Sequence, residues 1–439
     1  MRGPADVLTP CCFATIAGTP GGQDNYAPVR SRNQPSGPIQ ELDARAGRNA
    51  GTDRETLIRK GSRMPQYTRV LGCLLIAFAG HWGAASADDA DGFVALFNGE
   101  NLDGWVRVNT PESTWRVEDG RLVCSGKPIG ELRTTRMYQN FVMEVEWRHM
   151  KPKGNAGIFV WADDITAPGV PFHRSIEVQV LENAYGNTRS YTTHGDIFPI
   201  HGARMTPVNG RGGSRAFPVE SRSLPAPQWN HYRIECDRGA ISLAVNGKVV
   251  TRGMGCSPSK GYICLESEGG VVHYRNMRIK VLPDTPIEKA DVATANRNFR
   301  SIYSGLDLKG WLADEGWVAE DWVLAYTGQQ AGTISSQEQF QNVGFVIDVQ
   351  LGAQSGVVEL AVANALLRLD RRQGPLAAQL KKSGWNRLEG SLRGTSLKLW
   401  VNGKPVSDQT LQVRPGKGAI KLRAEGPTRF ANLFVRSLP

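Results

Sequence analysis

The sequence predicts an all-β protein made of two jelly-roll sandwiches in tandem. Apolar and polar residues alternate at period two in runs that are typical of half-buried strands: 141–147, 175–181, 231–236 and 241–245. Turn-forming pairs separate such runs, and the clearest is Asn246-Gly247. Between residues 93 and 283 no amphipathic helical pattern occurs. Many short strands in about 190 residues indicate a two-sheet sandwich of jelly-roll type.

A long-period internal repeat predicts the second sandwich. Phe93–Trp105 is echoed by Phe299–Trp311, and Trp229–Lys248 is echoed by Trp385–Lys404, each with the same internal spacing. Such self-similarity implies two domains of one fold. We therefore predict a first sandwich at 92–283, a linker at 284–298, and a reduced, divergent second copy at 299–439.

The N-terminal region has a different composition from the rest of the chain. Residues 64–87 combine a basic start, an apolar run over 70–79 and the small residues Ala85-Ser86-Ala87, which is the pattern of a secretory signal. The apolar run is too short to span a bilayer comfortably. We expect a secreted or periplasmic protein without a stable membrane span in its mature chain. Residues 1–63 lack periodicity and are expected to be disordered, or an over-extended gene start.

Net charge and cysteine spacing limit the classes of ligand that the protein is expected to bind. The net charge is +10, but residues 1–87 hold ten Lys/Arg and six Asp/Glu, so residues 88–439 carry +6. No basic block interleaved with aromatic residues occurs, which argues against nucleic-acid binding. The cysteines after residue 87 lack C-x-x-C spacing, so a zinc site built on them is not expected. One pair, Cys256 and Cys264, could close a small disulfide loop.

The first copy resembles the 3-keto-disaccharide hydrolase family through an ordered set of short motifs. These are Leu96–Trp105, Trp115–Gly120, Glu146–Arg148, Gly154–Ile158, Glu177–Leu181, His194–Ile200, Trp229–Tyr232, Val245–Gly247 and Tyr274–Ile279. The resemblance implies a concanavalin-like jelly roll, related to lectins and glucanases. It also implies cleavage of glycosides whose sugar carries a ketone at carbon 3.

The strand around Glu177 is the first candidate for the site. Glu177 and Gln179 share one strand face, roughly 6.6 Å apart. Glucanases of this fold carry two carboxylates at such a spacing, as general acid and nucleophile. Because the second position is Gln179, an ordinary retaining glycosidase is not expected on this strand.

A 3-keto sugar offers another route, in which a base removes the acidified hydrogen at carbon 2, the glycosidic oxygen leaves, and water adds. We predict Glu177 as the base, with the acid drawn from the loop that carries His194, Asp196 and His201. Further residues are candidates for substrate binding: Glu146, Arg148, Asn155, Gln179 and Glu266.

The histidine-containing loop permits other interpretations. Its histidines could cap turns on the surface, or His194, Asp196 and His201 could hold a divalent metal, since imidazole and carboxylate suit such ions. No cofactor is certain from the sequence. A non-catalytic, lectin-like carbohydrate-binding module remains the rival function, and a structural role for paired lectin-like domains is a third.

The second copy is shorter between the landmarks that it shares with the first. Phe345 and Trp385 are 40 positions apart, against 88 for Phe141 and Trp229. We therefore predict that the second copy lacks both the strand of Glu177 and the loop of His194 to His201. It is then not expected to catalyse the reaction of the first copy.

Overall fold

The computed structural model describes residues 91–185, 194–295, 297–353, 356–406, 412–413 and 416–439. The predicted N-terminal extension and signal segment lie outside these residues. The helices of the described part are three short 3-10 turns, η1 (Glu112–Thr114), η2 (Lys289–Asp291) and η3 (Ala377–Gln379). The predicted all-β class is confirmed. No helix among the described residues is long and apolar enough to cross a membrane.

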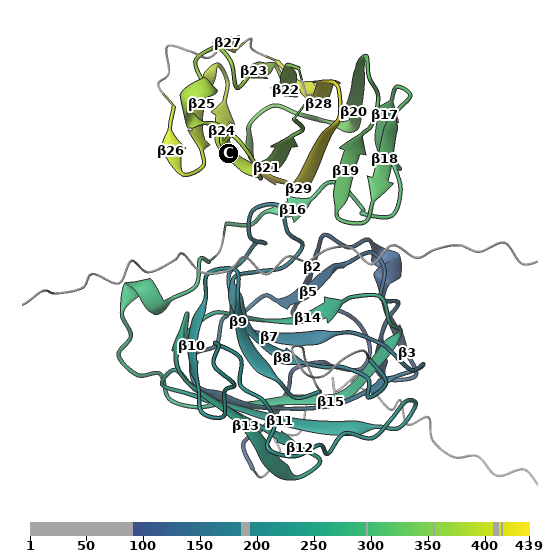
Figure 1. Cartoon of the computed structure of the whole chain (residues 1–439), viewed down its shortest axis with the longest axis vertical. Helices are drawn as coiled ribbons and strands as arrows, with labels where there is room; N and C mark the ends of the chain where they lie inside the picture. Colours follow the sequence, from purple (N-terminus) through teal and green to yellow (C-terminus); the bar gives the residue numbers. More distant parts are fainter. Residues whose placement is uncertain (1–90, 186–193, 296, 354–355, 407–411, 414–415) are drawn as a thin grey trace, which may run out of the picture. The chain divides into compact units, whose positions relative to one another are not determined.

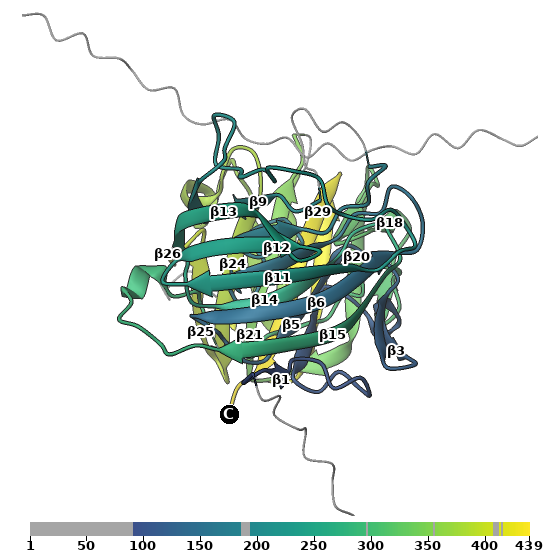
Figure 2. The ribbon, with the colours of Figure 1, turned by 90° about the horizontal axis from the view of Figure 1, so that it is seen from below.

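The first sandwich packs two sheets face to face (Figure 1). Sheet 1 has the order β10-β13-β12-β11-β6-β15-β4-β3, with β1 added on β15, and Figure 2 shows its central strands side by side. Its strands are β1 (Val94–Ala95), β3 (Trp115–Glu118), β4 (Arg121–Cys124), β6 (Phe141–His149), β10 (Arg204–Pro207), β11 (Asn230–Asp237), β12 (Ala240–Val245), β13 (Lys248–Ser257) and β15 (Val272–Val281).

Sheet 2 has the order β2-β5-β14-β7-β8-β9. Its strands are β2 (Trp105–Val108), β5 (Gly130–Thr134), β7 (Gly157–Ala162), β8 (Ser175–Gln179), β9 (Ile197–Ile200) and β14 (Tyr262–Ser267). The strand β8 carries Glu177 and Gln179, so this sheet positions the candidate site.

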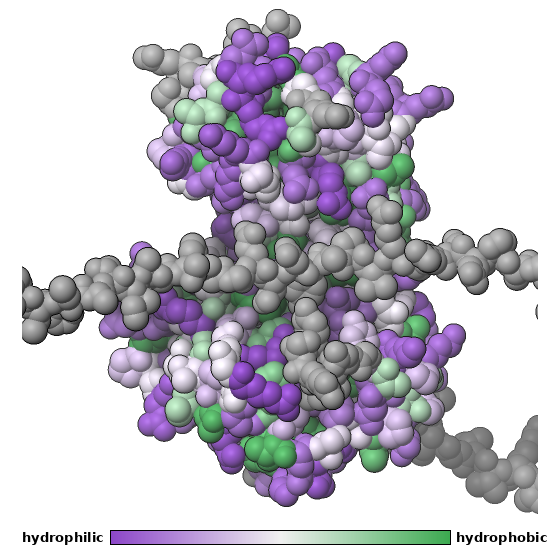
Figure 3. All heavy atoms as spheres, viewed as in Figure 1, coloured by the Kyte–Doolittle hydropathy of each residue, from purple (hydrophilic) through white to green (hydrophobic). Residues whose placement is uncertain are grey.

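The core between the sheets follows from strand alternation. On β6, Phe141, Met143, Val145 and Trp147 are buried. The residues that alternate with them after Met143 are partly exposed: Glu144, Glu146 and Arg148. The buried Tyr232 of β11 donates its hydroxyl to the carbonyl oxygen of Gln179, 2.8 Å away, and so links the two sheets. Hydrophilic residues predominate on the described surface drawn in Figure 3.

The second sandwich has two sheets as well. Sheet 3 has the order β18-β19-β29-β21-β24-β25-β26, with β16 added on β29. Its strands are β16 (Arg300–Ser301), β18 (Trp317–Glu320), β19 (Val323–Tyr326), β21 (Val343–Leu351), β24 (Asn386–Arg393), β25 (Ser396–Val401), β26 (Lys404–Pro405) and β29 (Thr428–Ser437). Sheet 4 has the order β17-β20-β28-β22-β23-β27. Its strands are β17 (Trp311–Ala313), β20 (Ala331–Phe340), β22 (Val358–Val362), β23 (Ala365–Leu369), β27 (Gln412–Val413) and β28 (Gly418–Glu425).

The order of sheet 4 corrects one prediction about the second copy. Strand by strand, β22 and β23 occupy the places that β7 and β8 hold in sheet 2. The strand predicted to be lost is therefore present, because a short hairpin replaces the long connection of the first copy. Its exposed side chains are Leu366 and Arg368, and Arg368 lies opposite Glu359. The second copy therefore keeps a strand in the place of β8, but this strand carries no carboxylate like Glu177.

The two Asn-Gly hairpins make closely matching hydrogen bonds in the two sandwiches. Asn246 accepts the His231 backbone N–H at 2.8 Å and donates to Asn230 at 3.0 Å. Asn402 accepts the Arg387 N–H at 3.1 Å and donates to Asn386 at 3.0 Å. Both Asn246 and Asn402 have positive φ, which Asn tolerates better than most residues. These contacts support the proposal that the sandwiches are copies of one unit.

The paired hairpins give a matched stability test. We expect Asn246→Ala and Asn402→Ala each to lower the free energy of unfolding by about 1–3 kcal/mol, because each loses side-chain hydrogen bonds and strains the left-handed turn. Chemical denaturation measures both losses. The exposed Lys404→Ala, in the same second hairpin, should stay within about 0.5 kcal/mol of the parent. A negligible loss in either Asn variant would show that its hairpin contacts are not needed.

Candidate functional site

Alternation on sheet 2 places polar residues in a row across four neighbouring strands. Glu131 of β5 lies directly opposite Glu266 of β14, and Gly157 of β7 lies opposite Gln179 of β8. Since side chains of paired residues point to the same side of a sheet, these residues share the face that turns away from the core. Glu131, Glu266 and Gln179 are nevertheless buried. A second row of paired residues runs beside it: Arg133, Cys264, Phe159 and Glu177.

Two carboxylates converge over Gly157. A Cβ atom on this glycine would lie 2.9 Å from Glu266 Oε2 and 3.0 Å from Glu177 Oε1. Two atoms at those distances from one point are at most about 6 Å apart. Paired carboxyl groups of retaining glycosidases are about 5–5.5 Å apart. The bare backbone of Gly157 is therefore what allows Glu177 and Glu266 to approach each other.

A third carboxylate is held beside this pair by amide side chains. Asn155 donates its Nδ2 to Glu268 Oε2. The Oδ1 of Asn155 in turn accepts a hydrogen bond from Gln179 Nε2 at 2.8 Å. Gln179 also donates to the carbonyl oxygen of Ala156, at 3.2 Å. These bonds fix the orientation of Glu268, which is only partly buried.

Burial and mutual repulsion shift the acidity of all three groups. Burial first, and then the charge of Glu268, raise the pKa of Glu177 well above its ordinary value, and the same two causes raise the pKa of Glu266. Burial raises the pKa of Glu268 to about 7, although hydrogen bonds from Glu266 and Asn155 act against it. Near neutral pH the group therefore holds both proton-bearing and ionised carboxyls.

A cation and a phenol lie close to these carboxylates. The positive charge of Arg215 counteracts the rise in the pKa of Glu177, and its guanidinium also pairs with Asp196 at 3.3 Å. The guanidinium carbon of Arg215 lies over the Phe198 ring, 3.4 Å from the ring centre. Tyr185 is 38% exposed, and burial followed by the charges of Glu268 and Glu266 raises its pKa. Tyr185 thus stands at the exposed margin of the carboxylate group.

The structure brings some of the predicted site residues together. Glu177, Gln179, Glu266 and Asn155 form the connected group just described, and Asp196 lies near Glu177 through Arg215.

The two histidines predicted as acids lie apart from this group. His194 Nε2 is 2.9 Å from the Ser221 hydroxyl, and His201 stacks on Phe172. Burial lowers the pKa of His194 and lowers that of His201 to about 4. Both imidazoles are then neutral near pH 7, so neither is suited to donate a proton there. In the part of the chain that the structure describes, His194, Asp196 and His201 do not form a metal-binding group.

Glu146 and Arg148, predicted as substrate-binding residues, lie on the other sheet. Both belong to β6 of sheet 1, where Glu146 pairs with Arg275 at 2.7 Å. The Arg148 guanidinium stacks 4.5 Å from the centre of the Trp229 ring. The sandwich core separates this outward face from Glu177. The structure therefore does not unite these two residues with the carboxylate group.

Four residues within or next to the carboxylate group were not identified from the sequence. They are Glu131, Glu268, Arg215 and Tyr185. Glu268 follows Glu266 at an interval of two, so the period-two pattern could have indicated it. Glu131 alternates in the same way with Arg133 on β5. Arg215 and Tyr185 lie in loops, where periodicity gives no signal.

Two surface cavities lie elsewhere on the described residues. One, of about 450 Å³, is lined by Arg371 and Lys382 of the second sandwich. The other, of about 680 Å³, is lined by Arg204 and Arg238 of the first. Neither cavity is lined by Glu177, Glu266 or Glu268. We base the candidate site on the grouped acids, because shifted acidity and converging polar groups mark functional chemistry better than open volume does.

Comparison with known proteins agrees with the sequence motifs. Residues 92–280 match the family model described as the 3-keto-alpha-glucoside-1,2-lyase-like domain. The predicted family resemblance is confirmed. A 3-keto-disaccharide hydrolase of Bacteroides thetaiotaomicron is 24% identical over 239 residues, which cover 44% of this chain and 80% of the relative.

Solved structures with similar folds cover the same share of the chain. A candidate glycosyl hydrolase of Parabacteroides distasonis is 22% identical, with a TM-score of 0.35, and covers 44% of this chain and 95% of its own. The β-glucanase of Bacillus licheniformis is 13% identical, with a TM-score of 0.28, and covers 44% of this chain and 100% of its own.

The raised pKa of Glu268 predicts a gain in stability on its replacement. The folded-state pKa of about 7 lies above the ordinary value of 4.5, so folding favours the protonated form. The stability of the parent should therefore fall as the pH rises from about 4.5 to 7. We expect Glu268→Gln to be more stable than the parent by about 1–3 kcal/mol above pH 7, and nearly equal to it below pH 4. Chemical denaturation across this range measures the difference.

Glu146→Gln is the matched control, with the opposite sign. Burial raises the pKa of Glu146, but hydrogen bonds from Asn276 and Arg275 outweigh it and leave the pKa lowered. Its replacement should lower stability at neutral pH, and the loss should disappear as the pH falls through the folded-state pKa. If Glu268→Gln were destabilising above pH 7, the burial argument for this site would be wrong.

Proposed function

We propose that the first sandwich cleaves 3-keto-glycosides by proton abstraction, elimination and hydration on the outward face of sheet 2. The family match and the name of the Bacteroides relative support the substrate class. The observation that carries the proposal is the convergence of Glu177 and Glu266 over the bare backbone of Gly157. The charge of Glu268 acts on both, and all three carboxyl groups have a raised pKa. A site that only binds sugar hydroxyls has no need of buried acids that oppose folding.

Glu268 is the proposed base. Asn155 donates a hydrogen bond to it and so favours its ionised form, and a pKa near 7 suits a base that works at neutral pH. The ionised carboxylate removes the proton from carbon 2, and the electron pair forms an enolate with the ketone at carbon 3. The electrons then return to form a double bond between carbons 1 and 2, and the bond to the glycosidic oxygen breaks.

Glu177 is the proposed acid, which revises its predicted role as base. Burial and the charge of Glu268 raise the pKa of this carboxyl and so favour its protonated form, which suits it to give a proton to the departing oxygen. Water then adds its hydroxyl at carbon 1 of the enone, and a proton returns to carbon 2. The net reaction consumes one water and releases the aglycone and a 3-keto sugar.

The enolate oxygen needs a positive or hydrogen-bonding neighbour during the reaction. Arg215 is the cation near Glu177, and we propose that it stabilises this oxygen. Its pairing with Asp196 and its contact with Phe198 hold the guanidinium in place before substrate arrives. Such preorganised charge avoids a reorganisation cost in the transition state.

Turnover of a defined substrate tests the proposal. Purified protein is incubated with a 3-keto-glucoside and with its unoxidised parent, and aglycone release is followed. We expect cleavage of the keto compound alone. Glu177→Gln and Glu268→Gln should each reduce its rate by about 10²–10⁴-fold, because each removes one proton-transfer partner. Glu146→Gln, on the other sheet, should leave the rate nearly unchanged.

The pH profile separates the two roles. The rate should rise as Glu268 ionises near pH 7 and fall again where Glu177 loses its proton. The rising limb should be lost in Glu268→Gln. Cleavage of both compounds would indicate an ordinary glycosidase instead. A folded protein that cleaves neither but binds sugar would establish the lectin-like alternative.

Gly157 gives a geometric test of the same site. In Gly157→Ala the new methyl group would lie 2.9 Å from Glu266 Oε2 and 3.0 Å from both Glu177 Oε1 and the Phe159 ring, so these side chains would have to shift. We expect a stability loss of at most about 2 kcal/mol, but a large loss of turnover because the acids are displaced. Gly213→Ala is the control, since its new methyl group would meet no atom within 4 Å. Equal turnover in both variants would contradict the proposed site.

A further inference from the structure

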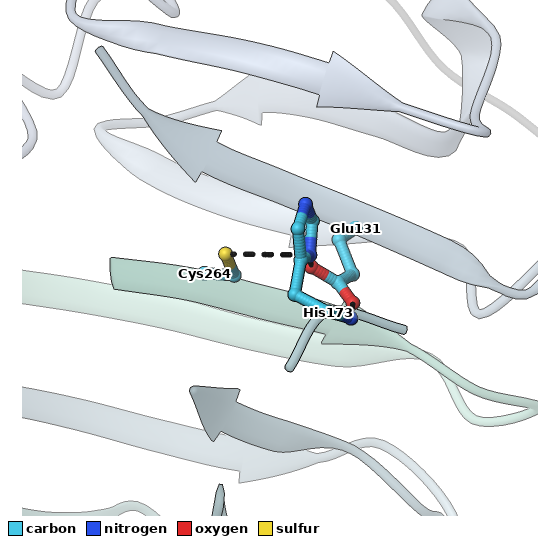
Figure 4. A group of neighbouring side chains, drawn as sticks. All are labelled: Glu131, His173 and Cys264. Carbon is cyan, nitrogen blue, oxygen red and sulfur yellow. Dashed lines mark hydrogen bonds and ion pairs between the residues drawn. The ribbon is translucent and has the colours of Figure 1, made fainter. Parts of the chain in front are cut away.

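A second group of reactive side chains lies next to the carboxylates and takes no part in the proposed reaction. It consists of Glu131 on β5, Cys264 on β14 and His173 in the segment that leads into β8. All three residues are fully buried. Figure 4 shows the three side chains pointing toward one another from separate segments of the sandwich. We call these residues the Glu-His-Cys group.

The ligand atoms of the Glu-His-Cys group converge on one point. His173 Nδ1 lies 3.8 Å from Cys264 Sγ and is hydrogen-bonded to Glu131 Oε2. The nitrogen, oxygen and sulfur atoms all lie within 4.8 Å of one another. A tetrahedral zinc ion, with bonds of 2.0–2.3 Å, places its nitrogen and sulfur ligands about 3.5 Å apart. The observed separation of sulfur and nitrogen is close to that value.

A backbone hydrogen bond already positions one of the ligands. Glu131 Oε1 accepts a hydrogen bond from the His173 backbone N–H, at 3.1 Å. That bond leaves Oε2 on the side of the imidazole and the thiol. A small turn of the carboxylate away from Nδ1 would open the space for an ion between the three atoms. The ion would thus complete a site whose second carboxylate oxygen is already anchored.

The chemistry of the donors selects the kind of ion. A carboxylate and a thiolate together carry two negative charges, which a divalent cation neutralises in a buried position. Calcium and magnesium prefer oxygen ligands alone, whereas thiolate with imidazole favours zinc. We propose that Glu131, His173 and Cys264 bind a zinc ion inside the first sandwich.

The surroundings favour a structural role for this ion. Cys264 belongs to a buried apolar cluster with Phe159, Ala162 and Tyr262, and Phe172 packs against it. This burial favours an ion with a structural role, while the three protein ligands leave the fourth position of a tetrahedral zinc to a water molecule. The ion would join β5 and β14 to the segment before β8, and would so fix the strand that carries Glu177. The proposal does not depend on the proposed reaction.

Metal content of the full chain tests this inference. The protein is produced without a metal-binding tag in zinc-supplemented medium, desalted, and analysed for metals by mass spectrometry. We expect about one zinc per chain. Cys264→Ser and His173→Gln should lose most of it, whereas Cys236→Ser, which changes a buried cysteine outside the group, should retain it.

Cobalt substitution gives a second readout, and its main result comes from the parent protein. After chelation of the zinc, Co²⁺ added to the parent protein should produce thiolate-to-cobalt charge-transfer absorption and the intense visible bands of a tetrahedral site. Cys264→Ser should lack the charge-transfer band. A folded parent that takes up neither zinc nor cobalt would overturn the proposal, and so would full zinc content in Cys264→Ser. Loss of glycoside cleavage with metal still bound would refute only the proposed reaction.

Discussion

The first sandwich is organised around the cost of holding several carboxylates on one sheet face away from water. A buried carboxylate is unstable unless it is protonated, hydrogen-bonded or paired with a cation. Each solution occurs here: Glu177 favours its proton, Glu268 is held by Asn155, and Glu131 is bonded to His173. The proton on Glu177 and the partners Asn155 and His173 therefore stabilise carboxyl groups that burial alone would destabilise.

That constraint also explains the difference between the two sandwiches. The six-stranded sheets share one strand order, yet the outward face of sheet 4 carries Arg368, Glu359 and Arg423 where sheet 2 gathers acids. Arg423 and Glu359 lie 3.6 Å apart and are partly exposed, so water screens their charges. The fold itself therefore does not require the carboxylates. The grouped acids of the first sandwich are therefore better explained by the candidate site than by the needs of the fold.

Sequence periodicity predicts strands and faces, but not the sheet to which a strand belongs. It identified Glu177 and Gln179 because alternation assigns residues to a face, and Glu266 was predicted as a partner for Glu177 on a neighbouring strand. Glu146 and Arg148 alternate equally well, yet β6 pairs with β11 and β15 in the opposite sheet. Only long-range pairing decides that, and a single sequence does not contain it. The loop residues Arg215 and Tyr185 were missed for a related reason, since no local pattern relates a loop to the strand it approaches.

The same limit applies to the Glu-His-Cys group. Zinc was not expected because motif spacing assumes ligands that are close in sequence, whereas Glu131 and His173 are 42 positions apart and His173 and Cys264 are 91 apart. A sheet brings such residues together through register: Cys264 lies opposite Arg133, and Glu131 lies two positions further along the same strand, on the same face. In a β-sandwich, chemistry is therefore assembled by strand pairing rather than by motifs. Candidate sites in such folds must be sought among cross-strand neighbours, where a glycine such as Gly157 marks the place that two side chains share.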